Sequence, residues 1–175
     1  MAALDQLSSE TVYSGRIFDV ERRRYRDPEG GEYEREIAVH PGAVAIVAHD
    51  GGDLYLVRQP REAIGADSVL EVPAGTMDVA GESELECARR ELGEEVGKAA
   101  ASWELLRAIH PSPGWAAETT TIFLATELAE GDGEPEAGER IEVVRWPLER
   151  LDEAIEASVD AKTLIGLMLL RERIS

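Results

Sequence analysis

The chain has 175 residues, 43% of them hydrophobic, so it is long and apolar enough for one domain with a substantial core. Its 36 acidic residues against 18 basic ones give a net charge of −18, which disfavours nonspecific binding to nucleic acid or to anionic membranes. No segment approaches the ~20 apolar residues of a membrane span, and the first residues lack the pattern of a secretory signal. A single cysteine excludes an internal disulfide, so we expect a cytoplasmic protein.

Short strands are predicted along the first part of the chain. They have partly alternating or wholly apolar sequences, and we place them at residues 11–25, 32–39, 43–48, 54–57 and 68–72. The first of these segments is long enough for either a strand pair or one bent strand. Glycine, proline and aspartate at residues 27–31 and 50–53 predict turns.

Residues 81–98 predict a helix. Ser83 followed by Glu86 fits a capping box, in which each side chain satisfies a free backbone N–H of the other residue. Gly97 fits a left-handed stop, and no proline intervenes. At about 100° per residue the apolar side chains gather on one side of the helix, at Leu85, Leu92 and Val96.

The same helix carries carboxylates on another side. Glu91 and Glu95 are four residues apart, so their like charges are neighbours and disfavour an isolated helix. A hard divalent cation would offset this repulsion, because Mg²⁺ prefers oxygen ligands and is often shared with substrate phosphates. Spacing alone, however, favours the simpler explanation of a solvated acidic face in a chain this acidic.

The rest of the chain predicts strands mixed with helices. We place strands at residues 103–109, 119–128 and 141–146, and helices at residues 147–157 and 160–173. Residues 130–140 form an acidic, glycine-containing loop. We find no internal repeat and no linker long enough for two domains, so the fold class is α/β or α+β.

The order of residues around the acidic helix resembles the signature of the Nudix hydrolases. Glu82, seven further residues and then the run 90–97, Arg-Glu-Leu-Gly-Glu-Glu-Val-Gly, match its fixed positions in register. Two departures exist. One extra residue separates Gly75 from Glu82, and Lys98 replaces the usual aliphatic residue. The first changes a loop and the second a packing contact, and neither removes an expected ligand.

Further segments resemble the ADP-ribose pyrophosphatase branch of this family. They are the runs at residues 40–47, 56–61, 71–75 and 112–115, and the similarity extends over residues 12–170. The resemblance implies an α/β/α sandwich around a mixed sheet. It divides the chain into an N-terminal antiparallel strand region at residues 1–40 and a Nudix hydrolase domain at residues 41–175.

The resemblance also implies hydrolysis of the diphosphate bond of ADP-ribose to AMP and ribose 5-phosphate, with Mg²⁺ or, as an alternative, Mn²⁺. The implied metal ligands are Glu91, Glu95, the backbone carbonyl of Ala74, Glu94, Glu82 and Glu118. For Glu82, direct ligation and orientation of the helix through Arg90 are equally expected. Two alternatives stay open: a pyrophosphatase for another nucleoside diphosphate sugar such as GDP-mannose, or a non-catalytic sensor that binds ADP-ribose.

The general base is expected in the late acidic loop. In this branch a glutamate of a mobile loop often has that role, and the loop here offers Glu134, Glu136 and Glu139, with Glu142 on the following strand. Glu139 aligns best, so the expected catalytic residues are Glu139, Glu95 and Glu91. Loop closure before the chemical step would suit the glycines of this segment.

Substrate contacts are expected from five residues. Arg35, Arg58 and Arg61 can pair with phosphate or ribose oxygens, and Arg61 is the best candidate for a diphosphate clamp because it lies in a turn. Glu71 is expected to bond a sugar or the adenine edge, and Trp115 completes the set. The partners are therefore a small nucleoside diphosphate sugar and, by resemblance, a second copy of the chain in a homodimer joined through the N-terminal strands.

Overall fold

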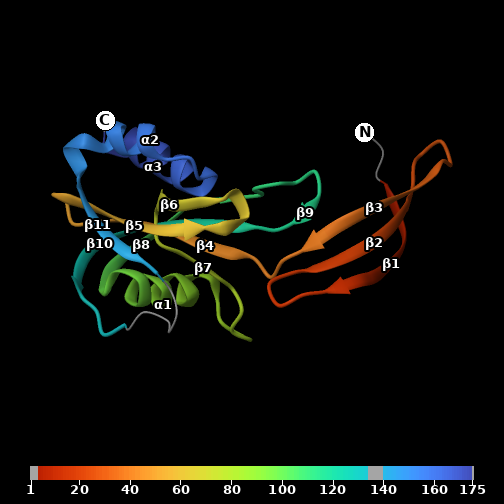
Figure 1. Ribbon diagram of the computed structural model, residues 1–175, viewed down its shortest axis with the longest axis horizontal. Coiled ribbons are helices and arrows are strands. Elements are labelled where there is room, and N and C mark those ends of the chain that lie inside the picture. The colour runs from red at the N-terminus through yellow and green to blue at the C-terminus, as the bar shows by residue number, and fades with distance from the viewer. Residues whose placement is uncertain (1–3, 134–139, 175) are drawn as a thin grey trace. The chain divides into compact units, whose positions relative to one another are not determined.

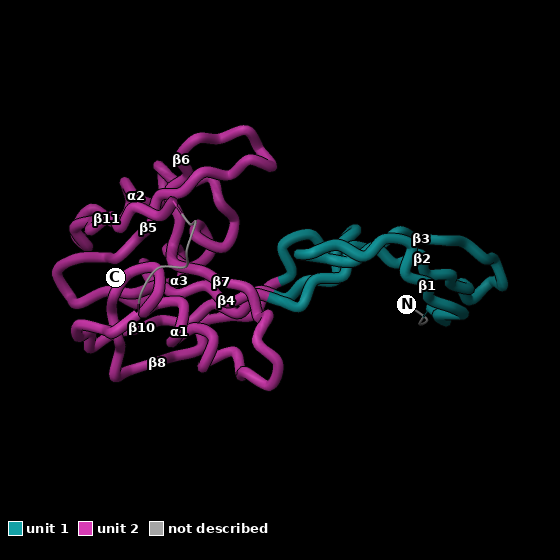
Figure 2. The backbone as a smooth tube through the Cα atoms, turned by 60° about the horizontal axis from the view of Figure 1, so that its bottom comes forward, with its two compact units in different colours: residues 1–42, 110–119 teal, residues 43–109, 120–175 magenta. Residues whose placement is uncertain are grey.

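The computed structural model describes residues 4–133 and 140–174. The chain forms two compact units, coloured separately in Figure 2. The first unit contains residues 1–42 and 110–119, and the second contains residues 43–109 and 120–175.

The first unit is built on a sheet in the order β1-β2-β3-β9. Its strands are β1 (Asp5–Ser14), β2 (Asp19–Arg26), β3 (Glu32–Val39) and the short β9 (Ala116–Ala117). The first three pair antiparallel, and β9 pairs parallel with β3. Residues 11–25, predicted as a strand pair or one bent strand, form a strand pair: they contain the end of β1 and most of β2. Residues 15–18 make the turn between the two strands, where Gly15 N–H donates to the Phe18 carbonyl.

The second unit is built on a mixed sheet in the order β11-β5-β4-β10-β8, with β6 on β5 and β7 on β4. The strands are β4 (Ala43–His49), β5 (Asp53–Arg61), β6 (Ala66–Glu71), β7 (Ala74–Thr76), β8 (Lys98–Ile109), β10 (Thr120–Glu130) and β11 (Glu142–Pro147). β10 runs parallel to β4 and antiparallel to β8.

Helices cover both faces of this sheet, as Figure 1 shows. Along β4, Ala45 and Val47 belong to the core cluster that contains residues of α2 (Leu151–Ala157) and α3 (Ala161–Ile174). The intervening Val44 and Ile46 belong to the cluster under α1 (Glu84–Val96). A strand buried on both faces has no polar side, which explains the unbroken apolar run. The α/β/α sandwich around a mixed sheet is confirmed.

The start and end of α1 follow the predicted local chemistry. Ser83 and Glu86 form the capping box, with Ser83 N–H donating to Glu86 Oε2 at 2.8 Å and Glu86 N–H donating to Ser83 Oγ at 3.3 Å. Gly97 adopts a left-handed φ of 69°, which costs glycine little.

The helix predicted at residues 147–157 differs from the observed structure. Pro147 ends β11 rather than beginning the helix, and a 3₁₀ turn, η2 (Leu148–Arg150), precedes α2. Pro147 pairs with Asp53 at the end of β11, and an edge position of this kind tolerates proline. Among the described residues, none of the helices is long and apolar enough to cross a membrane.

Candidate functional site

One cavity of about 430 Å³ in the second unit brings most of the expected residues together. We call it the acidic cavity. Its lining comes from β5, β7, the loop after β7 and α1, namely Gln59, Arg61, Ala74, Gly75, Thr76, Asp78, Val79, Arg90, Glu91, Glu94 and Glu95.

Glu95 is tied to the backbone of the Pro-Ala-Gly segment. Its side chain is buried, and its Oε2 accepts a hydrogen bond from Ala74 N–H at 2.9 Å. Ala74 is itself fixed by pairing with Ala45 of β4, and the Pro73 carbonyl accepts from Ile46 N–H at 2.8 Å. The last turn of α1 and the backbone of residue 74 are therefore held side by side, as the expected ligand set requires.

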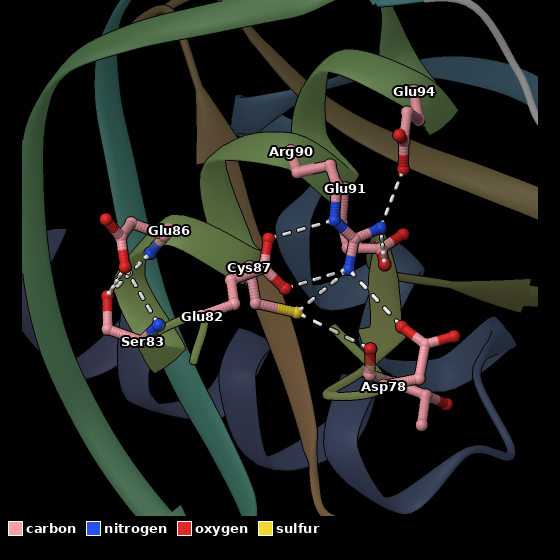
Figure 3. Close-up of polar contacts among 9 residues, drawn as sticks. Asp78, Glu82, Ser83, Glu86, Cys87, Arg90, Glu91 and Glu94 are labelled. Atoms are coloured by element: carbon pink, nitrogen blue, oxygen red, sulfur yellow. Dashed lines mark hydrogen bonds and ion pairs between the residues drawn. The ribbon is translucent and has the colours of Figure 1, made fainter. Parts of the chain in front are cut away.

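Arg90 connects the other carboxylates, as Figure 3 shows. Its Nε and Nη2 donate to the two oxygens of Glu82 at 3.0 and 3.2 Å. Its Nη1 donates to Glu91 at 2.6 Å and to Glu94 at 2.9 Å. The hydrogen bond to Glu82 is the largest cause that raises the pKa of Arg90, and Arg90 in turn lowers the pKa of Glu82. Arg90 thus holds the loop before α1 against the helix and keeps like charges apart.

Glu91 rests directly against Gly75. A Cβ atom added to Gly75 would lie 1.8 Å from Glu91 Cδ and 2.0 Å from its Oε1. Only glycine permits this approach of a carboxylate to the backbone. The glycine of the Pro-Ala-Gly segment therefore decides where the Glu91 carboxylate lies.

Cys87 belongs to the core. It is fully buried, its Sγ lies 3.6 Å from the Thr76 carbonyl, and Arg90 Nη2 donates to the sulfur at 3.4 Å. Burial raises the pKa of the thiol to about 12. A thiol of this kind stays protonated and is a poor nucleophile at neutral pH.

The donor set suits a hard divalent cation. Among the residues that the structure describes, no three histidine, cysteine, aspartate or glutamate side chains are gathered closely enough to hold a metal ion by themselves. Mg²⁺ does not need such a cage, because it retains several waters and commonly uses only one or two carboxylates together with substrate phosphates. Glu91, Glu94, Glu95 and the Ala74 backbone supply oxygen donors around one cavity. Glu82 has both oxygens bonded to Arg90, so it is placed to orient the helix, and its direct ligation of a metal stays a prediction.

Arg61 and Glu71 form a pair at the acidic cavity. Arg61 lines it, and Nε and Nη2 of Arg61 each donate to one oxygen of Glu71 at 2.6 Å. Glu71 is 1% exposed, and its Oε2 also accepts from Lys162 Nζ at 2.6 Å. Burial raises the pKa of Glu71, but the bonds from Arg61 and Lys162 outweigh it and the net shift is downward.

Sequence reasoning missed Lys162. It lies 91 residues from Glu71 along the chain, so no local pattern connects the two. One signal was available: the chain has only two lysines, Lys98 and Lys162, among 18 basic residues.

Arg58, expected to contact substrate, has a different environment. It lies on β5 opposite Glu142 and Leu70 in the ladder, and it is not among the described residues that line the acidic cavity. A second cavity of about 810 Å³ shares Gln59 and Arg61 with the first and includes Arg140.

The first unit contains three of the expected residues. Arg35 lies 4.5 Å from the ring centre of Tyr33, and both line a cavity of about 490 Å³ together with Trp115, which is 62% exposed. Glu118 follows β9, and its backbone carbonyl lies 2.9 Å from His110 Nδ1. Glu139 lies outside the described residues.

Comparison with known proteins gives consistent matches. The NUDIX domain family matches residues 38–165. The chain is 45% identical over 134 residues to the ADP-ribose pyrophosphatase of Mycobacterium tuberculosis (strain ATCC 25618 / H37Rv), covering 76% of this chain and 64% of that protein, which is just under two thirds of its length. It is 35% identical over 170 residues to the ADP-ribose pyrophosphatase of Bacillus subtilis (strain 168), covering 94% and 91% of the two chains. A crystal structure of an ADP compounds hydrolase superposes with a TM-score of 0.87 at 29% identity, covering 99% of this chain and 95% of that one.

Proposed function

Because the chain belongs to the Nudix hydrolase family, we propose that it hydrolyses the diphosphate bond of ADP-ribose, giving AMP and ribose 5-phosphate. The observation that carries this proposal is the meeting of three glutamate side chains of α1, a backbone segment and Arg61 at one cavity. Water supplies the oxygen of the new P–O bond, and the bond from phosphorus to the bridging oxygen breaks. Relatives named for ADP-ribose and for ADP compounds support the choice of substrate.

We propose Mg²⁺ as the cofactor, with Mn²⁺ as an alternative, held by Glu91, Glu95 and the Ala74 carbonyl, with Glu94 available to a second ion. Such ions, when bound, neutralise the charge of the diphosphate and lower the pKa of an attacking water. The residues of the chain supply the rest. Glu95 is pre-oriented by Ala74 N–H, and Arg90 spaces Glu91 and Glu94.

Arg61 is the proposed clamp on the diphosphate. Its side chain is 41% exposed and lines the cavity, while Glu71 fixes one edge of its guanidinium. A fixed, planar guanidinium recognises phosphate oxygens at a lower entropic cost than a freely moving one. Glu139, which lies outside the described residues, stays the proposed general base, and Arg58 stays a proposed contact to substrate.

Arg35 and Trp115 stay proposed contacts to substrate, and within the first unit both line one cavity with Tyr33. An aromatic ring with a cation above it is a surface on which a base can stack. Glu118, close to Trp115 in the chain, is kept as a proposed ligand of an outer ion. The strand region at residues 1–40 is proposed to join two copies in a homodimer, and residues 41–175 are proposed to carry the chemistry. We also propose a cytoplasmic enzyme, because the buried thiol of Cys87 is free and suits a reducing compartment.

The decisive experiment is a substrate panel with product analysis. The purified chain is incubated with Mg²⁺ and either ADP-ribose or GDP-mannose, and products are separated by liquid chromatography. We expect AMP and ribose 5-phosphate from ADP-ribose at the highest kcat/KM. Faster cleavage of GDP-mannose would favour the wider nucleotide-sugar alternative. Tight binding of ADP-ribose by calorimetry without any turnover would establish the sensor instead.

A further inference from the structure

The strongest unassigned feature is the buried charge of Glu71 at the end of β6. One of its oxygens accepts from Arg61, and the other accepts from both Arg61 and Lys162, each bond being 2.6 Å long. A buried carboxylate is tolerated only when it is paired and hydrogen-bonded in this way. The geometry with Arg61 is bidentate, so it fixes the plane of the guanidinium as well as its position.

The two cations of this group have different surroundings. The Arg61 side chain is 41% exposed and lines the acidic cavity, whereas the Lys162 side chain is 16% exposed and is not among the described lining residues. Within the described residues, Lys162 is therefore linked to the cavity through the Glu71 carboxylate that it shares with Arg61.

The first turn of α3 fixes Lys162 in place. Its Nζ lies 3.0 Å from Asp160 Oδ2 as well as 2.6 Å from Glu71 Oε2. Asp160 in turn accepts from the backbone N–H and the hydroxyl of Thr163 at 3.0 and 2.7 Å. Thr163 Oγ1 accepts a hydrogen bond at 2.9 Å from the backbone N–H of Val72, which directly follows Glu71. The ammonium group is thus positioned from both the helix and the strand end.

We propose that Lys162 is a positioning residue for hydrolysis, which acts through Glu71 to hold the guanidinium of Arg61 ready for the diphosphate. This inference rests on the proposed function and assigns Glu71 a role different from the direct contact to sugar or adenine expected above. With Lys162 present, two cations balance the carboxylates of Glu71 and Asp160. Without it the group has a net negative charge, which draws the Arg61 guanidinium toward Glu71 and away from the diphosphate.

The alternative is that Lys162 only anchors α3. A double-mutant cycle separates the two explanations, because residues that act as one unit show non-additive effects. The variants are Lys162→Met, Arg61→Gln and the double variant. For each we measure the Kd of ADP-ribose by calorimetry in EDTA, and then kcat and KM with Mg²⁺. Lys162→Arg tests rescue by a residue that keeps the charge, and Lys162→Gln replaces Lys162→Met if the latter does not fold.

The chain offers a matched control in its other lysine. Lys98 Nζ donates to Glu130 at 2.6 Å, and its side chain is 18% exposed, but it does not line the acidic cavity within the described residues. Lys98→Met should leave Kd and KM unchanged.

We expect Lys162→Met to weaken ADP-ribose binding by about tenfold or more, and to raise KM more than it lowers kcat. The double variant should bind no more weakly than Arg61→Gln alone. Losses that multiply in the double variant, or an unchanged Kd in Lys162→Met, would overturn the proposal. The binding measurement needs no turnover. If the wild-type chain bound ADP-ribose without cleaving it, the proposed hydrolysis would be refuted, and the Kd values of the variants would still test the role of Lys162.

Discussion

At the scale of single residues, Glu95 is the most buried of the described carboxylates that line the acidic cavity. It is buried and accepts from the Ala74 backbone, so a neutral amide of the same shape can take its place without a steric change. We expect Glu95→Gln to lower kcat by at least about a hundredfold, since an amide oxygen is a much weaker ligand for a divalent ion than a carboxylate. Steady-state rates with Mg²⁺ and far-ultraviolet circular dichroism are the measurements.

Glu156→Gln, on the exposed side of α2, is the control for Glu95→Gln and should leave the rate unchanged. A near-normal rate in Glu95→Gln with an intact dichroism spectrum would remove Glu95 from the catalytic machinery.

Gly75 gives a second prediction at this scale. A methyl group there would overlap the end of the Glu91 side chain, which is flexible enough to move away. Gly75→Ala should therefore displace this carboxylate and lower kcat/KM by about tenfold or more, with a small loss of stability. Rates and thermal unfolding are compared with those of Gly52→Ala, where the nearest atom would lie at 3.5 Å. Full activity in Gly75→Ala would mean that Glu91 tolerates a different position.

At the scale of elements, the hairpin between β4 and β5 depends on one ionised side chain. Asp50 accepts from the backbone N–H groups of Asp53 and Gly52 at 2.8 and 2.9 Å and from the Tyr55 hydroxyl at 2.9 Å. Led by the bond from Asp53, these donors lower the pKa of Asp50 from 3.8 to about 2.

A lowered pKa means that Asp50 stabilises the folded chain only while it is ionised. Its contribution is complete above the unfolded-state pKa and is lost as the pH falls through the folded-state value, so the window runs from about pH 4 to about pH 2. Urea unfolding of the wild type and Asp50→Asn should give a difference in unfolding free energy that is constant above this window and shrinks within it. A difference that persists unchanged at pH 2 contradicts this account.

The helices and strands also show how much of the structure could be predicted from the sequence. Ser83, Glu86 and Gly97 satisfy the ends of α1 with groups only a few residues away, so local chemistry was enough to locate this helix. The apolar run of β4 was equally informative. The bond from Lys162 to Glu71 spans 91 residues and follows from tertiary packing alone, which no local pattern records. The link between Arg90 and Glu82 was one of the two expected roles of Glu82, whereas the bond from Arg90 to Glu91 became evident only in the folded structure.

At the scale of the whole molecule, the N-terminal strand region is the surface through which we propose that two copies join. The end of β1 and the turn after it carry exposed apolar side chains, at Val12, Tyr13, Ile17 and Phe18. Contiguous exposed apolar side chains are typical of surfaces that associate. We expect light scattering at micromolar concentration to give twice the mass of one chain, and Tyr13→Ser combined with Phe18→Ser to shift the species toward the monomer. A wild-type monomer under these conditions rejects the dimer.

The contacts of Arg90 have a consequence for handling the protein. The guanidinium is a counter-ion for Glu91 and Glu94 of α1, so we expect the helix to form before any metal binds. We therefore expect folding not to require the metal, in contrast to zinc fingers, which unfold when chelators remove their metal. Preparations stripped with EDTA should stay folded, with a melting temperature lowered only by the lost free energy of Mg²⁺ binding, and adding Mg²⁺ back should restore turnover without a refolding step.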